Sequence, residues 1–84
     1  MRKDIKIGVV GLGYVGLPLA RLFSTKYPTI GYDLNAKRVE ELMLGHDATL
    51  EVADNLLQEA ININGFTCTS NLQEIADCNI YIVA

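Results

Sequence analysis

The sequence predicts an α/β domain with a parallel sheet, corresponding to the N-terminal part of a doubly wound fold. Short apolar runs typical of buried strands alternate with segments in which apolar residues recur at helical spacing. This alternation is typical of parallel strands joined by right-handed helical crossovers. A turn containing three glycines joins the first apolar run directly to the first helical segment.

The first strand and the first helix flank this glycine turn. The strand covers residues 5–10 and becomes continuously apolar, as in a strand with both faces buried. The helix has Pro18 in its first turn, where a missing N–H costs little. Residues 24–28 end the helix, and residues 29–33 form a second short strand that ends in a carboxylate. The apolar stripe predicted for the helix comprises Val15, Leu19, Leu22 and Phe23.

Two further helices are predicted between the second and third strands. Asn35 is a good N-cap and Gly45 a good C′ residue for a helix with the apolar stripe Val39, Leu42 and Met43. After a polar linker, a third helix has Asp47 or Thr49 as its cap and Glu51 in its first turn. Its apolar stripe comprises Leu50, Ala53, Leu56, Leu57, Ala60 and Ile61.

The remaining segment contains two strands. An Asn64-Gly65 turn leads into a third strand over residues 66–69, and Ser70 with Gln73 or Glu74 resembles a capping box. Residues 79–84 form a strongly apolar last strand. Because domains rarely finish inside such a strand, we expect residues 1–84 to be the N-terminal portion of a longer domain, with further domains outside this chain.

The stretch Gly11-Leu12-Gly13-Tyr14-Val15-Gly16 predicts a dinucleotide-binding turn of the Rossmann type. It follows a strand, opens a helix, and is followed 22 residues after Gly11 by Asp33 at a strand end. Gly11 allows the sharp turn, Gly13 lets the backbone approach a pyrophosphate, and Gly16 permits close helix packing. The helix N-terminus offers unpaired N–H groups to the phosphates. The alternative is a tight strand-to-helix turn that holds no ligand.

Asp33 and Arg38 are the candidate ribose-side residues. Asp33 is expected to accept hydrogen bonds from the adenosine ribose and to repel a 2′-phosphate, which favours NAD over NADP. The alternative is a turn or capping aspartate. Three roles stay open for Arg38, in the first turn of the second helix: flanking the adenine or ribose, helping to hold a 2′-phosphate, or pointing into solvent.

Composition excludes several function classes. The net charge of −3 and pI near 4.9 argue against nucleic acid or an anionic membrane as a partner. Met1-Arg2-Lys3 before the apolar residues 8–20 resembles a signal peptide, but Asp4, Lys6 and the high glycine content argue against one. The apolar run is also too short to span a bilayer. We therefore expect a cytoplasmic protein.

No residue combination predicts catalysis or metal binding within this chain. Cys68 and Cys78 are too few for a disulfide framework and lack metal-ligand spacing, so we expect two half-buried free thiols. His46 and Asp47 are interpreted as part of a plain polar loop, in preference to a substrate role. On their residue type alone, Tyr14 and Tyr81 are interpreted as packing residues.

The strings "IGVVGLGYVGLPLA", "GYDLNAKRVEEL" and "GHDATLEV" resemble the N-terminus of the UDP-glucose/GDP-mannose dehydrogenase family over essentially the whole chain. The resemblance is greatest to the bacterial branch that acts on UDP-N-acetylhexosamines, such as UDP-N-acetylmannosamine or UDP-N-acetylgalactosamine. By position, seven residues match the NAD-contacting segment of this family: Gly11, Gly13, Tyr14, Val15, Gly16, Asp33 and Arg38.

The resemblance implies a nucleotide-sugar 6-dehydrogenase that oxidises the C6 alcohol of a UDP-sugar to a carboxylate with two NAD, for capsule or surface-polysaccharide synthesis. It also implies that the catalytic cysteine, lysine and asparagine, and the UDP-sugar site, lie in later domains. Neither Cys68 nor Cys78 is then a catalyst, and this chain alone is expected to be inactive. We expect a homo-oligomer, and self-association of the isolated chain through an exposed strand, above all the last one.

Two alternative functions stay open. One is another Rossmann dehydrogenase, of the 3-hydroxyacyl-CoA or 6-phosphogluconate type, which shares the glycine turn but not the string "GYVGLP". The other is a non-catalytic nucleotide-sensing or assembly module, which keeps the fold and the NAD site without the chemistry.

Overall fold

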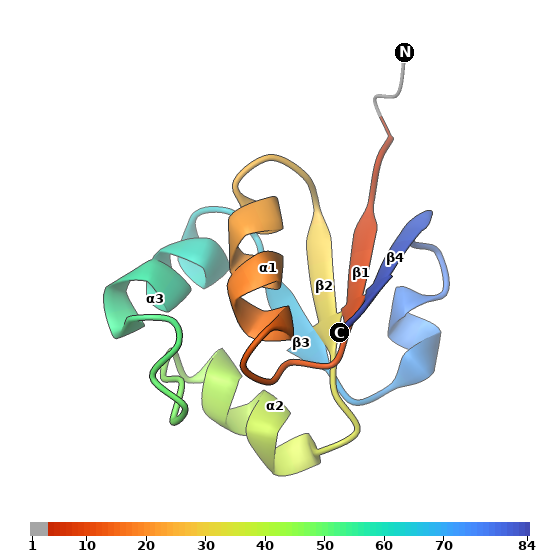
Figure 1. Ribbon diagram of the computed structural model, residues 1–84. Coiled ribbons are helices and arrows are strands. Elements are labelled where there is room, and N and C mark those ends of the chain that lie inside the picture. Colours follow the sequence, from red (N-terminus) through yellow and green to blue (C-terminus); the bar gives the residue numbers. More distant parts are fainter. Residues whose placement is uncertain (1–3) are drawn as a thin grey trace.

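A computed structural model describes residues 4–84, which form one parallel four-stranded sheet with helices packed on it (Figure 1). Met1, Arg2 and Lys3, the basic start of the rejected signal-peptide interpretation, lie outside the described residues. The parallel sheet predicted from the sequence is confirmed. Its strand order is β3-β2-β1-β4, where the strands are β1 (Ile7–Val10), β2 (Thr29–Tyr32), β3 (Thr67–Thr69) and β4 (Ile80–Val83).

The order of the strands reverses at β1. The chain moves from β1 to β2 and β3 on one side, and then returns to place β4 on the other side of β1. Ile7 therefore lies opposite both Thr29 and Ile80. In doubly wound folds, ligands bind outside the carboxyl ends of the strands at such a reversal. The helices that connect the strands are α1 (Gly16–Ser24), α2 (Ala36–Met43), α3 (Asp54–Asn62) and the 3-10 helix η1 (Leu72–Ile75).

The face of α1 that packs on the sheet matches the predicted stripe only in part, since Phe23 is partly buried against the core. Val15 and Leu22 are 64% and 53% exposed, whereas Leu17 and Ala20 are fully buried. The reason is that Val15 is the N-cap of α1 and lies before its first turn, while Gly16 and Ala20 are small enough to bring the helix close to β1. Leu17 and Ala20 join a core that also contains Val9, Leu42, Leu57 and Phe66.

The segment between α2 and α3 is longer than predicted. Helix α3 begins at Asp54 with Ala53 as its N-cap, so the prediction that Asp47 or Thr49 caps this helix is wrong. Leu50 has φ +61° and its side chain is exposed, and this left-handed conformation cannot continue a helix. The acidic residue in the first turn of α3 is Asp54, in place of the predicted Glu51.

The predicted ends of α2 are confirmed. The Asn35 side chain accepts hydrogen bonds from the amide groups of residues 37 and 38, and Gly45 follows the helix with φ +88°. Before the last strand, Asn71 and not Ser70 is the cap, since its side chain accepts from the Gln73 amide. No helix within residues 4–84 is long and apolar enough to cross a membrane.

Strand β4 lies at an edge of the sheet, and three of its side chains are exposed: Ile80, Tyr81 and Val83. The Tyr81 hydroxyl donates to the carbonyl of Ile75 at 2.6 Å, which ties the edge strand to η1. An apolar strand with an unpaired edge is a template for pairing with another chain. Self-association through this strand stays a prediction, as does a homo-oligomeric parent protein. Sedimentation of the isolated chain at rising concentration checks the first, and a monomer at all concentrations would contradict it.

Candidate functional site

The glycine turn lies at the carboxyl edge of the sheet, where β1 and β4 end side by side (Figure 1). Gly11 has φ +100°, and a Cβ there would lie 2.7 Å from the carbonyl oxygen of Ala84. The Gly11 amide donates to the Tyr32 carbonyl at 2.8 Å, and the Ala84 amide donates to the Val10 carbonyl at 2.9 Å. The turn therefore starts at the reversal point of the strand order, with β2 and β4 on its two sides.

The other two glycines of the turn have opposite surroundings. A Cβ on Gly16 would lie 1.6 Å from the Gly11 carbonyl oxygen, so no side chain fits there. A Cβ on Gly13 would meet no atom within 4 Å. Packing thus accounts for Gly11 and Gly16, whereas Gly13 borders open space into which a ligand can bring a phosphate close to the backbone.

The surface around Gly13 suits an anion. Within residues 4–84, the amide groups of residues 13–16 have no hydrogen-bond acceptor, as expected for the first turn of a helix. Such amide groups and the helix dipole favour a phosphate at this position. Tyr14 and Val15 are 67% and 64% exposed on the turn, so the interpretation of Tyr14 as a packing residue is wrong. The exposed turn fits the diphosphate of a dinucleotide.

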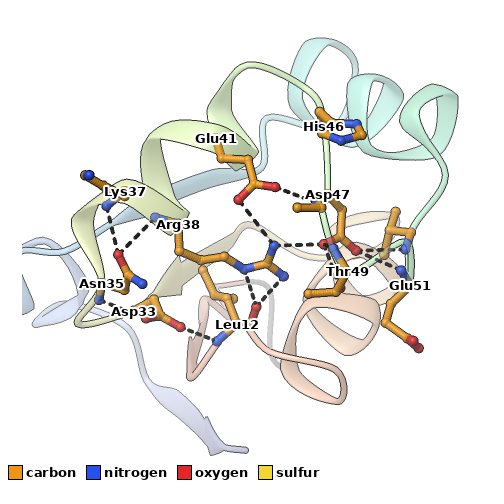
Figure 2. A network of polar contacts seen from close by, with 12 residues as sticks. Leu12, Asp33, Asn35, Lys37, Arg38, Glu41, His46, Asp47, Thr49 and Glu51 are labelled. Carbon is orange, nitrogen blue, oxygen red and sulfur yellow. Dashed lines mark hydrogen bonds and ion pairs between the residues drawn. The ribbon is translucent and has the colours of Figure 1, made fainter.

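Asp33 connects the end of β2 to the glycine turn (Figure 2). Its Oδ2 accepts from the Leu12 amide at 2.9 Å, and its Oδ1 accepts from the Asn35 amide at 2.9 Å. The hydrogen bond from the Asn35 amide is a turn interaction of the kind that the alternative interpretation of Asp33 expects. Asp33 does not cap α2, because the N-cap of this helix is Asn35. Each carboxylate oxygen can accept more than one hydrogen bond, so both retain capacity for the hydroxyl groups of a ligand.

Arg38 is not a solvated helix residue. Its side chain is 11% exposed, and both Nε and Nη2 donate to the Leu12 carbonyl, at 3.0 and 2.7 Å. Nη1 donates to Oδ1 of Asp47 at 2.8 Å and lies 3.7 Å from Oε1 of Glu41. Figure 2 shows the guanidinium between Leu12 and the loop that carries Asp47. Arg38 therefore fixes the glycine turn to this loop, and its contact with a cofactor stays a prediction.

The loop around Asp47 is ordered by a buried carboxylate, so its interpretation as a plain polar loop is wrong. Asp47 is fully buried and accepts from the Thr49 amide and hydroxyl, at 3.0 and 2.7 Å. It also accepts from the amide groups of Glu51 and Val52, both at 3.0 Å. The sequence signal for this arrangement is an Asp followed two residues later by Thr, which is typical of a side chain that closes a local turn.

The hydrogen bonds to Asp47 determine its pKa. Burial alone would raise the pKa of this carboxyl, but the hydrogen bonds from Thr49, from Arg38 and from the backbone outweigh burial and lower the pKa to about 2. Since the ordinary pKa is 3.8, the ionised form is favoured in the folded state.

Asp47 should therefore make stability fall in acid. Because its folded pKa is depressed, its contribution is complete above the unfolded pKa of 3.8 and is lost as the pH falls through about 2. We expect a loss on the order of 2 kcal/mol from this residue. Urea unfolding of wild type and Asp47→Asn between pH 7 and pH 2 measures it as the difference between the two pH profiles. Parallel profiles would contradict the expectation.

The remaining titratable candidates lie away from the glycine turn. His46 places Nδ1 2.9 Å from Oδ1 of Asp54, and this hydrogen bond raises the pKa of the exposed imidazole. Cys68 is half-buried as predicted, but Cys78 is buried, so the prediction of two half-buried thiols is wrong for Cys78. Burial raises the pKa of Cys68 to about 12. Both cysteines are free, and a thiol with so high a pKa as Cys68 is a poor nucleophile at neutral pH.

A family model described as the NAD binding domain of the UDP-glucose/GDP-mannose dehydrogenase family matches residues 5–84. The chain is 49% identical over 81 residues to a UDP-N-acetyl-D-glucosamine 6-dehydrogenase of Pseudomonas aeruginosa, covering 96% of the chain. It is 42% identical over 80 residues, covering 95% of the chain, to a protein of the same name from Salmonella typhi.

A solved structure has the same fold. A UDP-D-ManNAc dehydrogenase from Pyrococcus horikoshii superposes with a TM-score of 0.86 and 26% sequence identity over 95% of the chain. The chain spans 18% of the length of each of the two sequence relatives and 20% of the solved structure. Each similarity therefore concerns about a fifth of a longer protein.

Proposed function

Because the chain belongs to the UDP-glucose/GDP-mannose dehydrogenase family and is part of its NAD-binding domain, we propose that it holds NAD for a longer nucleotide-sugar 6-dehydrogenase. In this proposal the parent protein oxidises the C6 alcohol of a UDP-N-acetylhexosamine to the carboxylate, for surface-polysaccharide synthesis in the cytoplasm. When bound, NAD would supply the hydride acceptor, and two NAD per sugar would be needed for the four-electron oxidation of the alcohol to the carboxylate. The names of the sequence relatives support this substrate class.

The observation that supports this role most directly is the open space at Gly13 beside the free amide groups of residues 13–16. These groups are proposed to bind the diphosphate, with Tyr14 and Val15 on the exposed side of the turn. Asp33 is proposed to accept hydrogen bonds from the adenosine ribose, and Arg38 to hold the turn in place from the other side of Leu12. The residues of the chain fit the cofactor that its family uses.

Of the two alternative functions, the family match argues against the first and leaves the second open. The 3-hydroxyacyl-CoA and 6-phosphogluconate alternatives belong to other families, and the family match argues against them. A non-catalytic module of the same family is the remaining competitor. It shares the NAD site and differs only in the parent protein's activity.

The test uses the full-length parent protein with NAD and a panel of UDP-N-acetylglucosamine, UDP-N-acetylmannosamine, UDP-N-acetylgalactosamine and UDP-glucose. We expect NADH to form with one of the three acetylated sugars, at two NADH per sugar. NAD binding with no NADH formation on any sugar would favour the non-catalytic module. Absence of NAD binding by a folded protein would contradict the cofactor site itself. The isolated chain is the matched control and is expected to form no NADH.

A further inference from the structure

We propose that Asp47 and Glu41 determine the preference for NAD over NADP by holding and neutralising Arg38. This inference rests on the proposed NAD site and adds two residues that lie outside the glycine turn. It starts from a conflict in the site. A guanidinium beside a ribose-binding carboxylate is a typical partner for a 2′-phosphate, so Arg38 at first sight favours NADP.

Arg38 is a direct neighbour of the proposed ribose site. Asp33 accepts from the Leu12 amide, and Arg38 donates to the Leu12 carbonyl, so the carboxylate and the guanidinium bind the same residue from its two ends (Figure 2). Both side chains are held by main-chain atoms of the turn. A free guanidinium in this place would be within reach of an additional phosphate on the ribose.

Each of the three nitrogens of the Arg38 guanidinium already donates a hydrogen bond, so three of its five N–H groups are in use. Nε and Nη2 share the Leu12 carbonyl, and Nη1 donates to Asp47 and faces Glu41 at 3.7 Å. Arginine binds phosphate best with two parallel N–H groups on one edge of the guanidinium. The edge formed by Nε and Nη2 is occupied, and the Nη1 corner is bound by a carboxylate.

The local charge also disfavours a further anion. Glu41 and Asp47 place two carboxylates beside the single guanidinium of Arg38, and a third carboxylate, that of Asp33, binds the same residue, Leu12, as Arg38 does. Asp47 is fully buried, so solvent screens its interaction with Arg38 little. The Asp47 carboxylate therefore neutralises the positive charge of Arg38 that would attract a 2′-phosphate. The Asp33 carboxylate then repels that phosphate.

The hydrogen bond that Asp47 accepts from Arg38 can be tested apart from the hydrogen bonds that Asp47 accepts within its own loop. Four of the hydrogen bonds that Asp47 accepts come from Thr49, Glu51 and Val52, and only one comes from Arg38. Thr49→Val removes a loop bond and leaves the charge on Arg38 unchanged. Asp47→Asn and Glu41→Gln keep an acceptor oxygen and remove the charge.

The experiment measures the dissociation constants of NAD and NADP by calorimetry with the full-length parent protein and these variants. In Asp47→Asn the ratio of the NADP constant to the NAD constant should fall roughly tenfold, since the guanidinium of Arg38 is no longer neutralised by a buried carboxylate. In Glu41→Gln, where the carboxylate is farther away, the ratio should fall roughly threefold. In Thr49→Val it should stay at the wild-type value. Adding Arg38→Met to Asp47→Asn should restore the wild-type ratio.

The outcomes separate this inference from the proposed function. A wild type that binds neither cofactor contradicts the proposed function. A wild type that prefers NAD, with an unchanged ratio in folded Asp47→Asn, overturns only the inference. If Asp47→Asn does not fold, an unchanged ratio in Glu41→Gln overturns it. A fall that persists in the double variant, or an equal fall in Thr49→Val, also overturns it, because the effect would not depend on Arg38.

Discussion

Replacement of Gly16 by alanine is expected to destabilise the protein by more than about 3 kcal/mol, the upper end for an added methyl group in a packed core. The new Cβ would lie 1.6 Å from the Gly11 carbonyl oxygen and 2.8 Å from its carbonyl carbon. Both are main-chain atoms, so no side chain can turn away to make room. Helix α1 would have to move off β1, which opens the core at Leu17 and Ala20. Urea unfolding followed by circular dichroism measures the loss.

Gly13→Ala is the matched control, because it adds the same methyl group to the same turn. No atom lies within 4 Å of the new Cβ, so stability should stay within about 0.5 kcal/mol of wild type. NAD affinity of the full-length protein should nevertheless fall roughly tenfold or more, since the methyl group occupies the space that a diphosphate needs. A Gly16→Ala protein as stable as Gly13→Ala would contradict the close contact between Gly16 and the Gly11 carbonyl.

Asp33→Asn is expected to weaken NAD binding by roughly 10- to 100-fold, the loss of one or two hydrogen bonds to a charged group. NADP binding should weaken less, because the variant no longer repels a 2′-phosphate. The fold should persist, since the asparagine oxygen still accepts from either the Leu12 or the Asn35 amide. Calorimetric titration of the full-length protein with each cofactor measures both effects.

Asp77→Asn is the control for the loss of a carboxylate. Asp77 is exposed and pairs with Lys6 at 3.0 Å. Lys6 precedes β1 and Asp77 precedes β4, so this pair lies at the amino ends of the strands, whereas the glycine turn lies at their carboxyl ends. This surface pair should contribute little, and NAD binding should not change. If folded Asp33→Asn binds NAD as tightly as Asp77→Asn does, Asp33 is only a turn residue.

The elements that the sequence predicts correctly are those whose signals are local. The glycine spacing, the cap at Asn35 and the left-handed Gly45 each depend on bonds within a few residues. The packed face of α1 is different. In a nine-residue helix, the stripe through Leu22 and the stripe through Leu17 both fit helical spacing, and only the position of the sheet decides between them.

The candidate site divides in the same way. Gly11, Gly13, Gly16 and Asp33 follow a fixed spacing, which exists because one backbone turn must meet one strand end. The partners of Arg38 follow no such spacing. Leu12 lies 26 residues before it and Asp47 nine residues after it, and only the fold brings the three together. The sequence therefore predicts the turn but not the ion pair that holds it.

The central place of β1 in the sheet has a consequence for biosynthesis. β1 pairs with β2 and with β4, and the partner of Ile7 in β4 is Ile80. At translation rates of 5–20 residues per second, β4 leaves the ribosome roughly 2–10 s after β2. During that interval one edge of β1 has no strand to pair with. Chaperones bind such exposed strand edges, and aggregation starts from them. Because such distant contacts also slow folding, we expect the nascent protein to need protection of β1 until β4 has left the ribosome.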